Sequence, residues 1–216
     1  MKYKRCALAS YPRSGNTWMR HLIFAATGIK SAYILNAETD VVHHAAAIPE
    51  IAEENSPIIK THGYDSEQYD SVIHVVRNPW AAIASYLDYC QAFNVDIQRR
   101  AWFIEVEAKG WLKHAEYWRM TKEAGILPYH PVQYESLLVS PANELYAVLN
   151  QFLGVNVTVD QVETAVDACK LENLQAKGDP AFYPKGANRH VDETLTREEM
   201  AKITEIVSAE IYHWIS

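Results

Sequence analysis

The chain alternates short apolar runs with longer segments in which apolar residues recur every three or four positions. Short apolar runs bounded by turn residues predict strands, and such runs occupy 6–10, 56–60, 71–76 and 131–134. The run 71–76 is continuous and rich in β-branched residues, which is typical of a strand covered on both faces of a parallel sheet. We therefore expect four strands, the third of them deeply buried.

The segments with helical spacing predict helices that follow these strands. One runs from about Thr17 to Gly28, which marks its end, and another begins at Pro79, a residue that a first helical turn tolerates. Further helices are expected over 41–54, 99–124, 141–152, 159–169 and 197–214. Strands that alternate with helices predict a three-layer α/β/α domain with a mostly parallel central sheet. Ligands bind at the strand ends in such folds, so the residues after each strand are the functional candidates.

In two of these helices, the spacing of the apolar residues predicts which face packs against the core. The first places Trp18, Leu22, Ala25 and Ala26 on one face. The helix 99–124 carries Trp102, Val106, Trp111, His114, Ala115 and Trp118 at helical spacing. The pair Trp111 and Trp118 is expected to pack in the core.

Composition and charge narrow the classes of function. Of the 216 residues 49% are hydrophobic, and 6 Trp, 13 Tyr and 5 Phe are enough for a packed core, which excludes a disordered chain. We expect one domain over 1–216. With 20 Lys and Arg against 27 Asp and Glu the net charge is −7, so no nucleic-acid partner is expected, because phosphate-backbone affinity comes from massed Lys and Arg.

The spacing of the 3 cysteines and the length of the apolar stretches indicate the cellular compartment in which the protein is expected. Their spacing predicts neither a disulfide framework nor a metal site, and a reducing compartment follows. No stretch reaches the roughly 7–15 apolar residues of a signal peptide or the about 20 of a spanning helix. We therefore expect a cytoplasmic protein with no membrane association, and its oligomeric state is left open.

The segment after the first strand, Tyr-Pro-Arg-Ser-Gly-Asn-Thr-Trp, has the chemistry of an anion site. Gly15 permits close backbone approach, and Arg13 adds a full positive charge. Hydroxyl and amide donors are supplied by Ser14, Asn16 and Thr17. The first N–H groups of the following helix favour an anion at the same place. These features suit a phosphate or sulfate group, although a plain strand-to-helix turn with an N-cap accounts for the generic ones equally well.

The same segment departs from the standard nucleoside-triphosphate loop, Gly-x4-Gly-Lys-Ser/Thr. It has one glycine and no following lysine, and the strand 71–76 ends in Arg77 rather than in an Asp that could hold Mg²⁺. We therefore expect an anion held by protein cations without a metal, which argues against an ordinary ATPase.

Residues 11–18 resemble the 5′-phosphosulfate loop of sulfotransferases that use 3′-phosphoadenosine-5′-phosphosulfate (PAPS), whose usual form is Tyr-Pro-Lys-Ser-Gly-Thr-Thr-Trp. The departures are Arg13 for lysine and Asn16 for threonine. Arg13 keeps the charge but not the compact, movable ammonium of a lysine. The resemblance implies a P-loop-NTPase-like nucleotide-binding core. It also implies that the donor is bound by Arg13, Ser14, Gly15, Asn16, Thr17 and Trp18.

A second motif follows the strand 71–76. Arg-Asn-Pro at 77–79, with Ser85 eight positions after Arg77, resembles the 3′-phosphate site of the same family, Arg-Asn-Pro-x5-Ser-Tyr. Taken singly, Arg77 would be read as a surface charge and Ser85 as a hydroxyl on a helix face. The resemblance implies that both bind the 3′-phosphate.

A third motif, Lys60-Thr61-His62, resembles the Lys-Thr-His of the family, in which the histidine is the general base that deprotonates the acceptor. The chain has 9 histidines, so a lone histidine means little, but His62 follows a strand whose neighbours deliver both anion sites. Imidazole titrates near neutral pH and can take a hydroxyl proton. The resemblance implies that His62 is the base and that Lys60 and Arg13 neutralise charge on the transferring group.

Weaker matches add further candidates. Tyr134 is a candidate contact of the adenine ring, and Trp18 is a candidate stacking surface for the same ring. Lys185 and Gly186 stand where the family often has Arg-Lys-Gly at the 3′-phosphate, and Arg189 could substitute. A flexible surface loop accounts for these last residues equally well.

The resemblance covers about 4–196 and implies transfer of a sulfuryl group from PAPS to a hydroxyl, or as a less favoured choice an amine, of a small-molecule or carbohydrate acceptor. The product nucleotide would be adenosine 3′,5′-bisphosphate (PAP), and no metal is expected. Phe93, Trp102 and Phe103 could line the acceptor pocket, although helix packing explains them as well. The alternatives are a nucleotide-dependent small-molecule kinase of related fold, which would need Mg²⁺ and ATP, and a non-catalytic nucleotide-binding protein.

Overall fold

The computed structural model describes residues 1–33, 50–97, 99–177 and 191–215, the last seven of them by their backbone alone. Within these ranges five parallel strands form the central sheet, in the order β2-β3-β1-β4-β5. They are β1 (Cys6–Ser10), β2 (Ala32–Tyr33), β3 (Ile58–Thr61), β4 (Ser71–Val76) and β5 (Tyr129–Gln133). Cys6 is in register with Ile58 on one side and with Ser71 on the other, so β1 is the middle strand.

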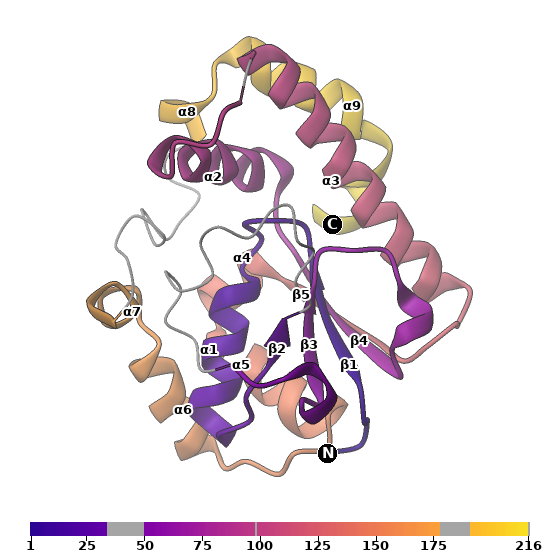
Figure 1. The fold of residues 1–216 in the computed structure, drawn as a ribbon, viewed down its shortest axis with the longest axis vertical. Coiled ribbons are helices and arrows are strands. Elements are labelled where there is room, and N and C mark those ends of the chain that lie inside the picture. The colour runs from indigo at the N-terminus through magenta and orange to yellow at the C-terminus, as the bar shows by residue number, and fades with distance from the viewer. Residues whose placement is uncertain (34–49, 98, 178–190, 216) are drawn as a thin grey trace.

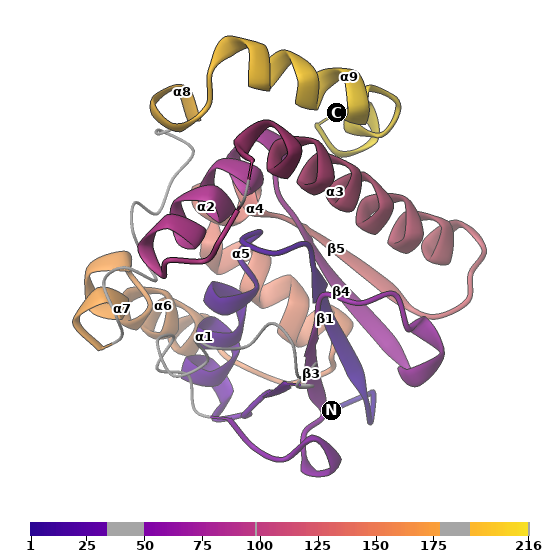
Figure 2. The same cartoon turned by 45° about the horizontal axis from the view of Figure 1, so that its top comes forward.

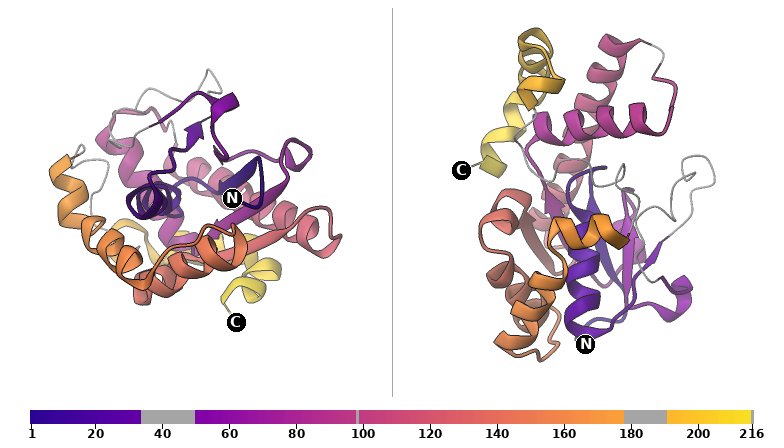
Figure 3. Two further views of the ribbon diagram at one scale, coloured as in Figure 1. Left: turned by 90° about the horizontal axis from the view of Figure 1, so that it is seen from below. Right: turned by 90° about the vertical axis from the view of Figure 1, so that its left-hand side faces the viewer.

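Helices cover both faces of this sheet (Figures 1 and 3). On one face lie α1 (Asn16–Thr27), α5 (Pro141–Tyr146), a π-helical turn at Ala147–Phe152 and α6 (Val159–Ala168). They share a core with Leu8, Ile73 and Val132 of the strands. On the other face α3 (Arg100–Glu123) sets the fully buried Trp118 against Ala7 and Val72. The expected three-layer α/β/α architecture with a parallel sheet is therefore confirmed.

A further helical layer stands beyond the carboxyl ends of the strands. There α2 (Pro79–Ala92), the first half of α3 and α9 (Arg197–Ile215) pack together, and Figure 2 shows α9 running along α3. Short helices complete the described chain: α4 (Tyr134–Val139), α7 (Leu171–Lys177) and α8 (Val191–Thr194). The site described below lies between this helical layer and the strand ends.

Helix ends follow the local chemistry of the sequence. Gly28 ends α1 in a left-handed conformation with φ +71°, and its N–H donates to the carbonyl of Phe24 at 2.8 Å. Pro79 occupies the first turn of α2, and the side chain of Asn78 caps that turn by accepting from the N–H of Ala81 at 3.2 Å. Helix α1 begins and ends within a residue of where the sequence predicts, and α2 begins at the predicted residue.

Several expectations differ from the structure. The strand expected at 131–134 is Tyr129–Gln133, and Tyr134 begins α4 instead of ending the strand. The segment 141–152 is divided into α5 and the π-helical turn. The helix expected over 41–54 lies mostly outside the described residues, and Glu53–Asn55 forms a single 3₁₀ turn. The strand β2 and the helices α7 and α8 were not predicted, because elements of two to seven residues carry too little periodicity.

Some side chains that the sequence pattern places on an apolar helix face are exposed to solvent. Ala25 is exposed, and Trp102 of α3 is 55% exposed, whereas Trp111 and Trp118 are buried as expected. The helical stripe that faces the core begins at Phe103, one residue after Trp102. In the described part of the chain, no helix is both long enough and apolar enough to span a bilayer.

The sheet order creates a switch point at its middle. The chain leaves β1 toward β2 and β3 on one side and then crosses β1 to reach β4 on the other. Connections that depart in opposite directions leave a crevice beyond the carboxyl ends of such strands. The segments that follow β1, β3, β4 and β5 all open onto this edge.

Candidate functional site

The loop after β1 approaches the crevice with an unusual backbone. Arg13 has φ +63° and Gly15 has φ +101°, so two residues within three positions adopt the left-handed region. Gly15 is the N-cap residue of α1, and no side chain caps this helix end. The hydroxyl oxygen of Ser14 is buried without a hydrogen-bond partner. Free helical N–H groups and an unpaired buried hydroxyl together suit an oxyanion.

Tyr134 explains why residue 15 is a glycine. A Cβ atom at this position would meet Cδ2 of Tyr134 at 2.5 Å and Cε2 at 3.0 Å. Trp18 meets the same ring edge-on with 6.1 Å between centroids, and its Nε1–H donates to the carbonyl of Cys169 at 3.1 Å. The expected adenine contacts Trp18 and Tyr134 are therefore neighbours, and Tyr134 also supports the loop from behind.

Arg77 is buried at the end of β4, and its side chain turns toward this loop. Its Nη1 donates to the carbonyl of Arg13 at 2.9 Å, and its guanidinium lies 4.4 Å from the ring centroid of Tyr134. Burial lowers the pKa of Arg77 from its usual value, but an arginine stays protonated in proteins. A buried cation thus stands where β1, β4 and β5 end.

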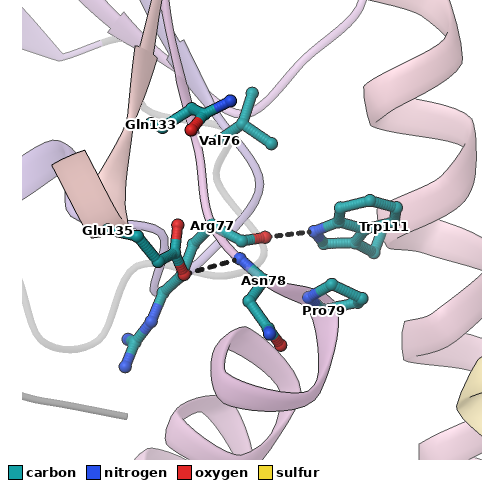
Figure 4. Close-up of a pocket in the computed structure, with 7 residues that line it drawn as sticks. All are labelled: Val76, Arg77, Asn78, Pro79, Trp111, Gln133 and Glu135. Atoms are coloured by element: carbon teal, nitrogen blue, oxygen red, sulfur yellow. Dashed lines mark hydrogen bonds between the residues drawn. The ribbon is translucent and has the colours of Figure 1, made fainter. Parts of the chain in front are cut away.

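The backbone around Arg77 is held from two sides (Figure 4). The indole N–H of Trp111 donates to the Arg77 carbonyl at 3.0 Å, and a Glu135 oxygen accepts from the N–H of Asn78 at 3.1 Å. These residues, with Val76, Pro79 and Gln133, line a cavity of about 100 Å³. Figure 4 shows the Arg77 side chain pointing away from Trp111. The cavity therefore lies behind the motif, and the charge of Arg77 faces the crevice.

Arg13 and Ser85 come together from different elements. Nε of Arg13 donates to Oγ of Ser85 at 3.3 Å, and its guanidinium lies 5.1 Å from the ring centroid of Tyr89. Ser85 is buried in α2. Arg13 was expected beside the transferring group, but its guanidinium contacts Ser85, while its backbone carbonyl accepts from Arg77. The two residues expected at the 3′-phosphate, Arg77 and Ser85, are thus both hydrogen-bonded to Arg13.

His62 is fixed by the end of β1. Its Nδ1 lies 2.6 Å from the carbonyl oxygen of Ser10, and because a carbonyl can only accept, Nδ1 carries the proton. In the neutral ring Nε2 then keeps its lone pair. Burial lowers the pKa of His62 well below its usual value, and the nearby charge of Lys60 lowers it further. A neutral imidazole with a basic Nε2 is the form that a general base requires.

Of the remaining residues expected at the site, the structure describes Asn16 and Thr17. Asn16 is buried, and its Nδ2 donates to the carbonyl of Leu8 at 2.8 Å and to the hydroxyl of Ser10 at 3.2 Å. Thr17 is partly buried in the first turn of α1. The other expected residues lie outside the described residues: Lys185, Gly186 and Arg189.

Sequence reasoning missed four residues that shape this region. Ser10 orients His62, Tyr89 covers Arg13, and Glu135 holds Asn78. Glu107 of α3 accepts a hydrogen bond from the hydroxyl of Tyr11. Of these four, only Glu107 could have been singled out from the sequence, because it interrupts the apolar stripe of α3 four positions before Trp111.

Comparison with known sequences identifies the family of the chain. A family model described as a sulfotransferase domain matches residues 4–207. A WSCD family member of Drosophila pseudoobscura pseudoobscura, GA21586, is 27% identical over 174 residues, which is 74% of this chain and 54% of the relative. The chain spans between about a quarter and about half of the curated relatives it matches.

Solved structures match the fold over nearly the whole chain. Mouse sulfotransferase SULT7A1 complexed with PAP superposes with a TM-score of 0.74 at 18% identity, covering 97% of this chain and 85% of the other. Retinol dehydratase in complex with androsterone and PAP gives a TM-score of 0.71 at 14% identity, covering 99% and 82%. At these identities the likeness concerns the fold.

Proposed function

The chain belongs to the sulfotransferase domain family, and on that basis we propose that it transfers a sulfuryl group from PAPS to a hydroxyl of a small-molecule acceptor and releases PAP. One observation carries the proposal: the neutral His62 and the cation Lys60 at the end of β3, and the buried cation Arg77 after β4, flank the end of β1 at one edge of the sheet. Preorganised positive charge beside a base is the machinery that transfer of an anionic group needs.

The loop after β1 fits the 5′-phosphosulfate of the donor. The uncapped N-terminus of α1 offers backbone N–H groups, Gly15 leaves room for close approach, and Ser14 has an unused hydroxyl. Trp18 and Tyr134 would border the adenine ring. Asn16 would act indirectly, because its amide already donates to Leu8 and Ser10.

The 3′-phosphate would bind beside α2. Arg77, Ser85 and Arg13 offer two guanidinium groups and a hydroxyl there, and guanidinium groups bind phosphate oxygens with two parallel hydrogen bonds. Arg13 therefore serves the 3′-phosphate in this proposal, and Lys60 is the cation assigned to the sulfuryl end. Lys185, Gly186 or Arg189 would complete the site from the C-terminal loop.

His62 would start the reaction. As the acceptor oxygen forms its bond to sulfur, the bond between sulfur and the bridging phosphate oxygen breaks in line, and Nε2 of His62 takes the acceptor proton. The hydrogen bond from Nδ1 to Ser10 keeps Nε2 directed away from β1. Lys60 would neutralise charge that develops on the bridging oxygen.

The proposal also names the class of acceptor and the compartment in which the protein acts. The retinol dehydratase structures carry androsterone or retinol beside PAP, both of them small molecules. We extend this class to the present chain, with a carbohydrate hydroxyl or an amine as less favoured acceptors. We also treat residues 1–216 as one domain that acts in the cytoplasm.

Thermal unfolding with added nucleotide tests the proposal against the kinase alternative. PAP should raise the melting temperature and ATP with Mg²⁺ should not, because a bound ligand stabilises only the folded state. Release of PAP from PAPS with a panel of hydroxyl acceptors would then establish transfer and exclude a non-catalytic nucleotide-binding protein. Stabilisation by ATP with Mg²⁺ and none by PAP would overturn the proposal.

A further inference from the structure

A carboxylate interrupts the buried stripe of α3. Phe103, Trp111 and Trp118 of this stripe are at most 6% exposed, yet Glu107 occupies the position one turn before Trp111. Burial raises the pKa of Glu107, while the hydrogen bond from Tyr11 lowers it. A carboxylate turned toward the interior costs desolvation energy that an ordinary core position would avoid.

Glu107 is tied to the strand end that orients the candidate base. The hydroxyl of Tyr11 donates to its Oε2, and Tyr11 directly follows Ser10, whose carbonyl binds His62. The ring of Tyr11 packs beside α3 at Gly110, where an added Cβ would lie in ordinary contact, 3.5 Å from Cε2 of the ring. Among the described residues Oε1 of Glu107 accepts no hydrogen bond. One oxygen is therefore tied to the strand end, and the other is available.

Three tyrosine hydroxyls lie within electrostatic range of this carboxylate. Burial raises the pKa values of Tyr11, Tyr64 and Tyr86, and the charge of Glu107 raises all three further, which places these hydroxyls within its field. Tyr64 stands two residues after His62, and Tyr86 packs on Phe103 with 5.7 Å between centroids. All three phenols stay neutral at physiological pH, so they present rings and hydroxyls beside one anion.

Two cations border the same space without pairing with Glu107. Lys113 lies over the ring of Tyr64 at 4.7 Å, and Arg13 lies over Tyr89 at 5.1 Å. Neither forms an ion pair with Glu107, whose contact with the described residues is the Tyr11 hydroxyl. Within the described residues, the carboxylate is thus left available to a cation.

We propose that Glu107, Tyr11, Tyr64 and Tyr86 form an ammonium subsite of the acceptor pocket, so that the acceptor carries a protonated amine beside the hydroxyl that receives the sulfuryl group. Carboxylates and aromatic faces together are the chemistry that recognises ammonium groups. The inference rests on the proposed function, because it is the acceptor of that reaction whose class it names. A neutral acceptor would leave this partly buried carboxylate with the Tyr11 hydroxyl as its hydrogen-bond donor among the described residues.

Two matched pairs of probes test the subsite on the PAP-saturated protein. Tyramine is compared with 4-propylphenol, and 6-amino-1-hexanol with 1-heptanol, by calorimetric binding and by kcat/KM with PAPS. We expect the amine of at least one pair to be favoured about ten- to a hundredfold, the range of a charge-assisted hydrogen bond with a buried partner. The absence of an amine preference in both pairs would overturn the proposal.

Variants separate recognition from a structural tether between α3 and the strand end. Glu107→Gln keeps an acceptor for the Tyr11 hydroxyl but removes the charge, so it should fold normally and lose the amine preference. Glu105→Gln, two residues away and paired with the exposed Lys109, is the matched control and should keep it. Retention of the preference in Glu107→Gln would contradict the subsite.

PAP binding distinguishes this inference from the proposed function. Glu107→Gln should bind PAP as the wild type does, because Glu107 contacts neither Arg77 nor Ser85. If the wild type fails to bind PAP, the proposed function fails, and the same probe pairs are then compared on the free protein. A preference for the amines there, lost in Glu107→Gln, would still support an ammonium site.

Discussion

Arg13 and Ser85 are joined across the site: Nε of Arg13, in the loop after β1, donates to Oγ of Ser85, in α2, at 3.3 Å. The contact draws the guanidinium toward α2, where Tyr89 covers it. The backbone carbonyl of Arg13 meanwhile accepts from Arg77. Two cations and one buried hydroxyl are therefore assembled by a single loop.

Arg13→Ala should weaken PAP binding more than AMP binding. AMP lacks the 3′-phosphate, which is the group that a guanidinium at Ser85 would bind. A charge-assisted hydrogen bond is worth about 1.5–3 kcal/mol, or about ten- to a hundredfold in Kd. Isothermal titration of both nucleotides measures the difference. Equal losses for PAP and AMP would place the Arg13 charge at the 5′ end instead.

Gly15→Ala should destabilise the fold by about 2–5 kcal/mol in urea denaturation, because backbone strain at positive φ costs about 1–2 kcal/mol and overpacking about 1–3 kcal/mol. The new methyl group would collide with Tyr134. Gly28→Ala is the matched control: φ is +71° there and no atom lies within 4 Å of the added Cβ, so only the strain remains. In a Tyr134→Ala background the excess cost of Gly15→Ala should disappear. A cost at Gly15 no larger than at Gly28 would refute this role of Tyr134.

Stability should fall as the pH falls below about 6.5, the usual pKa of histidine. Burial lowers the pKa of His114 to about 3 and that of His74 well below its usual value, so both rings are neutral in the folded chain. Between the two pKa values the unfolded chain binds more protons, which lowers the free energy of unfolding by up to about 1.4 kcal/mol per pH unit for each histidine. Denaturation of the wild type and of His114→Leu at several pH values should give a shallower slope for the variant. Equal slopes would show that His114 does not contribute.

The sheet and the phosphate segments follow from local sequence. β1 and β4 have the predicted bounds because their apolar runs are short and sharply ended by Tyr11-Pro12 and Arg77-Asn78. The three motifs, at 13–18, 60–62 and 77–85, lie at or just after the ends of strands. Because parallel strands end on the same side of a sheet, the sequence alone was enough to predict that these motifs meet at one edge.

Side-chain partners across the sheet could not be predicted in the same way. Arg13 was expected at the transferring group, and only the three-dimensional packing of α2 against the loop shows its contact with Ser85. The hydrogen bond of Tyr11 to Glu107 joins positions 96 residues apart, and no local pattern reports such a pair. The strand β5 was misplaced by two residues because Pro131 and Tyr134 fit either a strand or its flanking turn.

Activity should persist to lower pH than a freely exposed histidine would allow. His62 acts as a base only when it is neutral, and its lowered pKa keeps it neutral below pH 6.5. The acid limb of kcat/KM, which reports the free enzyme, should therefore lie below pH 6.5. Lys60→Met removes the second cause of the lowered pKa, so it should move this limb toward higher pH. A limb centred at or above pH 6.5 in the wild type would contradict the description of His62.

His62 is the proposed base of a PAPS-dependent transfer, and the variant His62→Asn tests this role most directly. Asparagine can still donate an N–H to the Ser10 carbonyl but cannot take a proton. With whichever probe of the acceptor panel releases PAP fastest, turnover should fall about 10²–10⁴-fold, the usual worth of general-base assistance. Calorimetric binding of PAP should stay within about twofold of the wild type. Wild-type turnover in His62→Asn, with PAP bound normally, would contradict the claim.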